Sequence, residues 1–315
     1  MRRRTALFVA PLAAIALIGA GCGGGDSTTG NSGNTTDNST GGSTDPVAIL
    51  NAIQVPTTAT EPTKVVFKVN ADLKGTISNA QAAAFLGDGP ISVELSGPTD
   101  PAKKAADLAF TLKAGKLDFA GNLRVLDGKT GYIQLKDKWY ALPADSLNSS
   151  SSTSSADIDK VTEALKSVKP ANLVKNPEYK GTEDIEGRST NHVSGDVDTQ
   201  GLVTTIADIA KSQNESVSES EIQEAQAKID QYVKNAKVDV WVDQETNEVR
   251  RLQLKGDFVT DSQMKSESGL DGATIDITVQ GTPTDSPDIS APSGALSSQQ
   301  LQTDLTGILL QSLGG

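Results

Sequence analysis

Hydrophobic and polar residues alternate along most of the chain between residues 64 and 281. In KVVFKVNADLKG, Val65, Phe67 and Val69 fall on one side of an extended backbone, and Lys68 and Asn70 fall on the other. The alternation recurs in PISVEL, ADLAFTLKAG, KLDFAGNLRVLDG, KTGYIQLKDKWYALP, YKGTED, RSTNHVSGDV, KVDVWVD, EVRRLQLKGDF and ATIDITVQG. A period of two with one apolar side predicts antiparallel strands whose sheet has one dry face and one wet face.

Short turn signals join these runs in sequence order. Asp127-Gly128 separates two alternating runs, and Glu186-Gly187 separates two others. A pair of this kind between alternating segments is typical of a two-residue hairpin. Consecutive hairpins predict an antiparallel meander of about ten strands, which is wide enough to curve strongly.

Helical periodicity interrupts the meander. Apolar stripes with a 3.6-residue period predict helices over 155–168, 199–212 and 218–233, and the last begins with a capping box from Ser218 to Glu221. A short helix over 46–53 is also expected. A strongly curved sheet cannot fill its concave side with backbone, so helices must fill it. The fold class predicted is therefore α+β: a half-barrel of antiparallel strands with helices packed on the concave side.

The last residues form a separate segment. Pro283, Pro287 and Pro292 end regular strand pairing. The stretch SSQQLQTDLTGILLQSL then places Leu301 and Leu305 on one helical face, together with Ile308 and Leu309. We expect residues 291–315 to form a linker and a short amphipathic helix, which docks over the open sheet edge or cavity mouth or contacts a membrane-bound partner. A frayed tail is the alternative.

The first residues have the layout of an export signal. Arg2, Arg3 and Arg4 precede an apolar run over 6–20, and small residues follow up to Cys22, the only cysteine in the chain. The segment before Cys22 resembles a bacterial lipobox, although Gly19 stands where leucine is usual. The resemblance implies a signal peptide over 1–21, cleavage after Gly21 and acylation of Cys22. A plain secretory signal is the alternative.

Composition separates a tether from a folded part. Residues 22–45 are mostly Gly, Ser, Thr, Asn and Asp, which cannot bury enough apolar surface to fold. Residues 46–290 are long enough for one domain. The serine run 147–155 is interpreted as a surface loop, with a domain linker as the alternative. The protein is thus expected to be exported and anchored to the outer face of the cell membrane.

Charge and residue types exclude several functions. Loss of the three signal arginines would lower the formal net charge from −12 to −15. Nucleic acid is an unsuitable partner for such a surface, because affinity for polyanions depends on Lys and Arg. His192 is the only histidine, and no Gly-x-Ser-x-Gly elbow or phosphate-binding glycine loop occurs. No catalytic residue, metal site or cofactor is predicted, and the protein is not expected to be an enzyme.

The order of these segments resembles a known family. The runs DGKTGYIQLKDKWYAL, NPEYKGTEDIEGRSTNHVSGDVD and VDVWVDQETNEVRRLQLKGDF, within Pro46 to Ile289, are similar to the LppX/LprG class of actinobacterial lipoproteins, which resembles the LolA/LolB carriers in fold. The resemblance implies an apolar cavity between sheet and helices. It also implies that the cavity binds acylated lipids or glycolipids at the cell envelope.

Apolar residues on the predicted dry face are the candidates for lining such a cavity. Each is equally an ordinary core residue on sequence grounds alone. The candidates are Phe67, Val69, Phe110, Leu112, Phe119, Leu123, Ile133, Val240, Leu252 and Leu254.

Three functions are compatible with these patterns. The first is a membrane-anchored lipoprotein that binds an acylated lipid or glycolipid for transport or presentation. The second is an envelope sensor or regulator that uses the same fold to contact a partner protein. The third is a structural surface lipoprotein without a ligand.

The lone cysteine leads to a first prediction. Cys22→Ala removes the only acylation site, so the variant should leave the membrane fraction. Fractionation of cells that express each form measures this. The lipobox interpretation is wrong if the variant still sediments wholly with washed membranes.

Overall fold

The computed structural model describes residues 42–54, 61–78, 83, 89–115, 117–143, 170–212 and 218–314. The signal segment, Cys22, most of the tether, the serine run and the helix predicted over 155–168 lie outside the described residues. Among the described helices, none combines the length and the apolar character that a membrane span requires.

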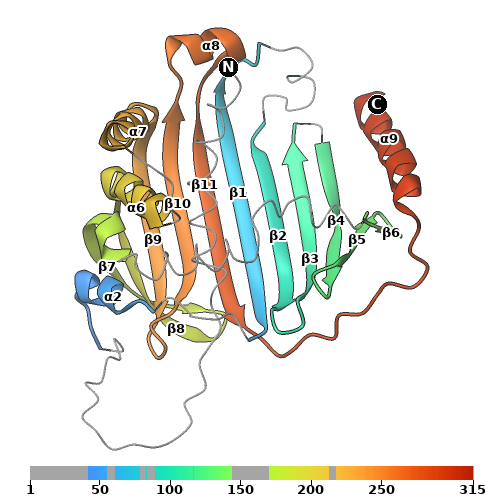
Figure 1. Ribbon diagram of the computed structural model, residues 1–315, viewed down its shortest axis with the longest axis horizontal. Coiled ribbons are helices and arrows are strands. Elements are labelled where there is room, and N and C mark those ends of the chain that lie inside the picture. The colour runs from blue at the N-terminus through green and yellow to red at the C-terminus, as the bar shows by residue number, and fades with distance from the viewer. Residues whose placement is uncertain are drawn as a thin grey trace, which may run out of the picture.

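The described strands form one antiparallel sheet that does not close (Figure 1). Its order is β6-β5-β4-β3-β2-β1-β11-β10-β9-β8-β7, so β6 and β7 are the edges of an 11-stranded sheet. The predicted α+β class is confirmed. The strands are β1 (Thr63–Gly75), β2 (Ile91–Asp100), β3 (Ala105–Ala114), β4 (Leu117–Leu126), β5 (Thr130–Leu135), β6 (Lys138–Ala141), β7 (Val174–Ile185), β8 (Arg188–Val197), β9 (Val233–Asp243), β10 (Val249–Val259) and β11 (Leu270–Pro283).

One predicted strand is in fact two. The run KTGYIQLKDKWYALP was counted as one of about ten strands, but it divides into β5 and β6 around Lys136 and Asp137. Lys136 has a φ of 54°, a left-handed conformation that turns the chain back on itself. The extra hairpin brings the strand number to eleven.

The predicted hairpins are confirmed. Asp127 and Gly128 have φ values of 56° and 64°, and Glu186 and Gly187 have values of 51° and 83°. Two consecutive left-handed residues form the turn whose twist matches that of the strands it joins.

Register places the apolar residues on one side of the sheet. Leu252 pairs with Val279, Val279 with Phe67, and Phe67 with Leu95. Directly paired residues point to the same side, and every second residue along each strand shares that side. We call this side the apolar face and the opposite side the outer face. All of the candidate lining residues fall on the apolar face.

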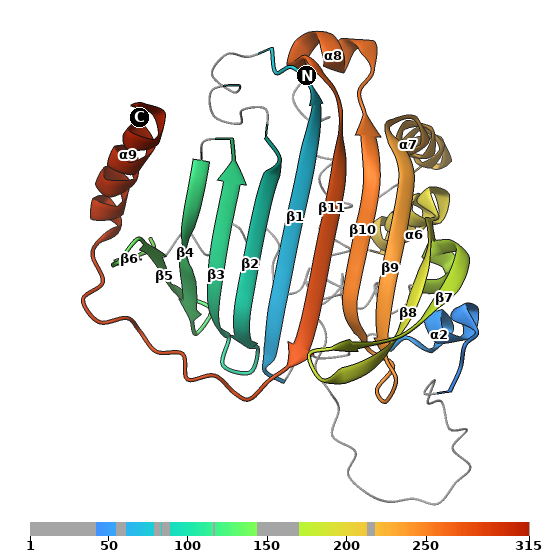
Figure 2. The ribbon, with the colours of Figure 1, turned by 180° about the vertical axis from the view of Figure 1, so that it is seen from behind.

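Helices meet the sheet at both of its ends (Figures 1 and 2). The helices α2 (Pro46–Ala52), α6 (Thr199–Ser212) and α7 (Glu219–Tyr232) lie at the β7–β10 end, with the 3₁₀ turn η2 (Pro170–Leu173). Ile49 and Leu50 of α2 are wholly buried against this end of the sheet. The helices predicted over 46–53, 199–212 and 218–233 are confirmed, as is the capping box of Ser218 and Glu221.

The helix α8 (Ser262–Ser268) was not predicted. It is too short for an apolar period to be recognised. Its ends carry the signals instead: the side chain of Asp261 accepts a hydrogen bond from Met264 N, and Gly269 ends the helix with a φ of 78°.

The predicted C-terminal helix α9 (Ser298–Gly314) lies at the β6 end of the sheet. Its linker runs along the lower ends of β1–β4 in Figure 1, where Arg124 Nη1 donates to Ser290 O at 2.8 Å and Lys103 Nζ donates to Ser286 Oγ at 2.7 Å. Leu296 then forms a one-residue parallel bridge with Tyr140. The tail is therefore docked on the sheet edge.

Strand β7 is irregular along its length. Its pairing with β8 shifts between Lys175 and Glu178 and again between Tyr179 and Gly181. Asn176 and Gly181 take positive φ values of 50° and 115°. These bulges bend the edge strand away from a straight ladder.

Gly121 leads to a second prediction. A methyl group there would collide with the Gln134 carbonyl oxygen and would lie 2.8 Å from the Phe110 ring. Gly121→Ala should therefore lower the free energy of unfolding by about 1–3 kcal/mol, measured by urea denaturation. Gly256→Ala is the control, because its new methyl group meets its nearest atom at 3.5 Å. Equal stability of both variants would contradict the close approach of β3, β4 and β5 at Gly121.

Candidate functional site

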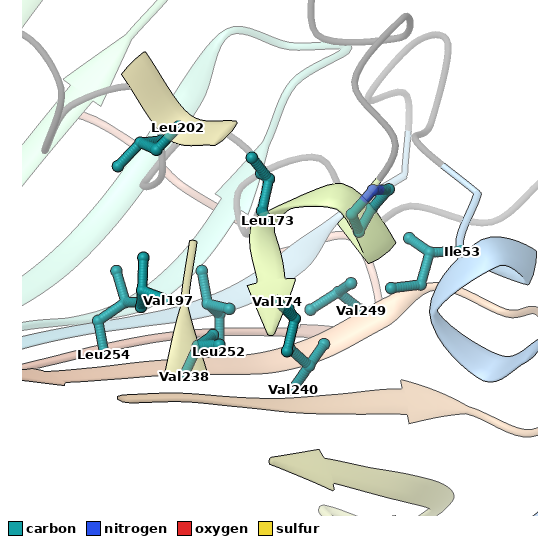
Figure 3. Close-up of a pocket in the computed structure, with 11 residues that line it drawn as sticks. Ile53, Leu173, Val174, Val197, Leu202, Val238, Val240, Val249, Leu252 and Leu254 are labelled. Atoms are coloured by element: carbon teal, nitrogen blue, oxygen red, sulfur yellow. The ribbon is translucent and has the colours of Figure 1, made fainter. Parts of the chain in front are cut away.

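An apolar pocket opens at the β7–β10 end of the apolar face (Figure 3). Its empty space, counted out to the surrounding solvent, is about 600 Å³. Every residue that lines it is apolar: Ile53, Pro170, Leu173, Val174, Val197, Leu202, Val238, Val240, Val249, Leu252 and Leu254.

Two strands form the floor of the pocket. Val240 pairs directly with Leu252, and Val238 pairs with Leu254. Val240 and Leu252 retain only 5% and 8% of their exposure. Alternation in KVDVWVD and EVRRLQLKGDF places these side chains on the same side, so the sequence pattern itself produces the apolar floor.

Short helices form the walls. Figure 3 shows Leu173 of η2 and Leu202 of α6 on one side of the pocket, opposite Val238, Leu252 and Leu254. Ile53, at the end of α2, lies on another side. The walls therefore come from three segments that lie far apart in the sequence.

Asp198 fixes the start of α6 beside the pocket. Its Oδ1 accepts a hydrogen bond from Gly201 N at 3.0 Å and lies 2.9 Å from Lys175 Nζ. Burial acts to raise the pKa of Asp198, but the hydrogen bond from Gly201 and the Lys175 ammonium outweigh it and hold the pKa below its ordinary value. The ionised carboxylate caps the helix that carries Leu202.

The structure divides the candidate lining residues into three groups. Val240, Leu252 and Leu254 line the pocket. Phe110, Phe119 and Ile133 lie in a separate cluster with α9. Phe67, Val69, Leu112 and Leu123 are half-buried on the apolar face.

Several pocket residues were not among the candidates. Leu202 lies on the predicted helical stripe of 199–212, so a search of the helices would have found it. Ile53 and Leu173 carry no such signal, because one follows a two-turn helix and the other belongs to a four-residue 3₁₀ turn. Only the tertiary structure brings them to the pocket.

A buried ionic cluster closes the hairpin next to the pocket. Arg250 is 1% exposed; its Nε lies 2.8 Å from Asp243 Oδ2 and its Nη2 lies 3.0 Å from Glu248 Oε2. Burial raises the pKa of Glu248. The segment Asp243–Glu248 is thus a hairpin turn, and the cluster holds the ends of β9 and β10 together beside Val249.

His192 lies on the outer face, behind the pocket floor. Its Nδ1 is 2.8 Å from Glu183 Oε1 and its Nε2 is 2.9 Å from Asp239 Oδ1. Its ring stacks on Trp241 at a centroid distance of 4.2 Å, and Trp241 Nε1 donates to Glu183 Oε2. Arg251 lies over Trp241 at 5.2 Å. These five residues, which we call the outer polar cluster, connect β7, β8, β9 and β10.

Among the described residues, no group of His, Cys, Asp or Glu is arranged to hold a metal ion. The outer polar cluster and the pocket lie on opposite sides of the sheet, because His192 and Val193 are consecutive residues of β8. The charged groups of the cluster therefore lie outside the pocket, whose lining is apolar throughout.

No family model and no curated protein matches the sequence. Among solved structures, LprF from Mycobacterium bovis is 15% identical, with a TM-score of 0.35, over 80% of this chain and 99% of that one. Lipoprotein LppX from Mycobacterium tuberculosis is 14% identical, with a TM-score of 0.29, over 71% and 89%. A LolA superfamily protein from Nitrosomonas europaea is 8% identical, with a TM-score of 0.23, over 78% and 96%.

LppX gives its name to the class that the sequence resembles. At such low TM-scores the matches carry no argument about ligand or activity. The function of this chain therefore has to be inferred from its own residues.

The outer polar cluster leads to a third prediction. Hydrogen bonds from Trp241 and His192 lower the pKa of Glu183 below its ordinary value of 4.5. A carboxyl group whose pKa is lowered by folding stabilises the fold above its ordinary pKa, and this contribution is lost as the pH falls through the lowered value. Glu183→Gln should therefore reduce Tm near pH 7, and the difference from wild type should shrink below pH 4.

Glu245→Gln is the control, because Glu245 lies on the exposed hairpin turn, where its side chain faces Arg188. Melting curves of the three proteins from pH 7 to pH 3 measure the effect. A Glu183→Gln difference that stays constant over this range would contradict the role given to the ionised carboxylate.

Proposed function

We propose that this protein is an exported, membrane-anchored lipoprotein that binds the acyl chains of a lipid or glycolipid. The observation that carries the proposal is the wholly apolar lining of the pocket. Small-molecule sites normally include a few polar groups that orient the ligand. A lining without such groups suits a ligand that is itself apolar.

An acyl chain meets this requirement. Each methylene group that moves from water into an apolar site contributes about 0.8 kcal/mol. No lining residue carries a charge or a hydrogen-bonding side chain. The pocket therefore selects the chain of the lipid, and the head group stays outside it with little selectivity.

The position of α2 connects the pocket to the proposed anchor. The tether ends at Asp45, which caps α2, and Ile53 at the far end of α2 lines the pocket. A flexible tether of this composition and length spans about 25 Å on average. Anchoring through Cys22 keeps the pocket near the membrane surface, where acylated molecules are concentrated. The proposed role is binding for transport or presentation, and it requires no catalysis.

Two variants of α6 test the proposal. Leu202 and Gln200 both lie in the first turns of α6, but Leu202 faces the pocket and Gln200 is exposed. Leu202→Asp should weaken the binding of a fluorescent long-chain fatty acid at least about tenfold, because the carboxylate must be buried with the chain. Gln200→Asp adds the same charge to the same helix and should bind like wild type.

Circular dichroism of both variants controls for folding. Equal affinity of the two variants would show that the chain binds elsewhere. A wild-type protein that binds no acyl ligand would favour the sensor or the ligand-free structural lipoprotein instead.

A further inference from the structure

Helix α9 covers a second part of the apolar face. Leu301 is 8% exposed and packs with Leu135 and Tyr140, which are 3% and 2% exposed. Leu305 of α9 and Phe110, Phe119 and Ile133 of the sheet pack around these residues and are only partly buried. The apolar surface of β3–β6 beneath α9, which we call the groove, is thus covered by a segment from the end of the chain.

One row of paired residues runs from the pocket floor to this surface. The row starts at Leu254 on the pocket floor and ends at Phe119 beneath α9. Register pairs its members in the order Leu254, Ile277, Val69, Val93, Leu112 and Phe119. All six are apolar and share one side of the sheet.

Among the described side chains of α9, Asp304 makes polar contacts with β6. The hydroxyl of Tyr140 donates to Asp304 Oδ2 at 2.7 Å, and Lys138 Nζ lies 3.4 Å from the same oxygen. Burial and this hydrogen bond raise the pKa of Tyr140 to about 12, so the hydroxyl remains a donor at neutral pH. Among the described side chains of α9, Leu301 alone is buried.

The helix is also weak in itself. Gly307 lies in its interior and has no atom within 4 Å of the position that a β-carbon would take. Glycine at such a position lowers helix stability by about 1 kcal/mol relative to alanine. The linker is held independently through Ser286 and Ser290. The linker therefore has contacts of its own that do not involve α9.

We propose that the groove beneath α9 is a second acyl-binding site and that α9 is its exchangeable occupant. The proposal rests on the proposed lipid-binding function. An acyl chain offers the groove the same apolar cover as Leu301 and Leu305, without requiring a helix to be ordered. A bound lipid then extends from the pocket along the shared row of residues, and α9 moves aside.

Three variants test the exchange with palmitate as the probe, in full-length protein. Tyr140→Phe removes the hydroxyl that holds Asp304 and should raise the affinity for a second palmitate about tenfold. Gly307→Ala stabilises α9 and should lower that affinity about fivefold. Tyr132→Phe is the control: Tyr132 pairs with Arg124 and Ala141 and lies on the outer face, so its loss should change neither affinity.

Native mass spectrometry counts the palmitates bound, and hydrogen exchange of residues 298–307 reports whether α9 opens. We expect two palmitates per chain and faster exchange of these amides when the second binds. The exchange model is overturned if α9 stays fully protected at saturation, or if the Tyr140 and Gly307 variants bind as wild type does.

The two proposals fail in different ways. Failure of the wild-type protein to bind any palmitate would overturn both proposals. A single palmitate that is lost in Leu202→Asp, with no change in α9, would leave the pocket proposal standing and overturn the second site alone.

Discussion

One wide sheet with a single apolar face constrains the rest of the structure. The register carries apolar side chains in rows across neighbouring strands, such as the row from Leu254 to Phe119. Among the residues that the structure describes, no second sheet lies opposite this one, so its rows depend on helices or on a ligand for cover. Buried apolar surface contributes about 25 cal/mol per Å², which makes incomplete cover unfavourable and gives an apolar ligand its affinity.

Polar contacts on the outer face hold the strands in register. His192, Trp241 and Arg251 come from three neighbouring strands, and they connect through stacked rings and carboxylates rather than through an apolar core. Arg250 does the same for the β9–β10 hairpin from a buried position. Since these polar contacts lie behind or beside the pocket, the floor stays ordered while its apolar side remains available for a ligand.

Much of the fold was predictable, because alternation and turn residues are local signals. These signals predicted the sheet and the hairpins at Asp127-Gly128 and Glu186-Gly187. Helical periodicity, which is also local, predicted four of the helices. The extra strand β6 and the helix α8 were missed, since both depend on one or two residues with special backbone angles. The site was predictable only in part. Val240 in the pocket and Phe119 beneath α9 show the same alternation, so sequence alone cannot tell a pocket floor from a covered core. Leu173 belongs to no periodic segment.

For a protein anchored to a membrane as proposed, the irregular edge strand β7 has a consequence. Proteins tethered to a surface meet one another in two dimensions and at high local concentration, and unpaired strand edges are where such encounters become irreversible. The β6 edge is already occupied by Leu296. The β7 edge combines bulges at Asn176 and Gly181 with charged side chains such as Lys180, the features that discourage edge-to-edge pairing. A sheet that, as proposed, keeps one face accessible to lipids is thereby hindered from joining its neighbours into a continuous sheet.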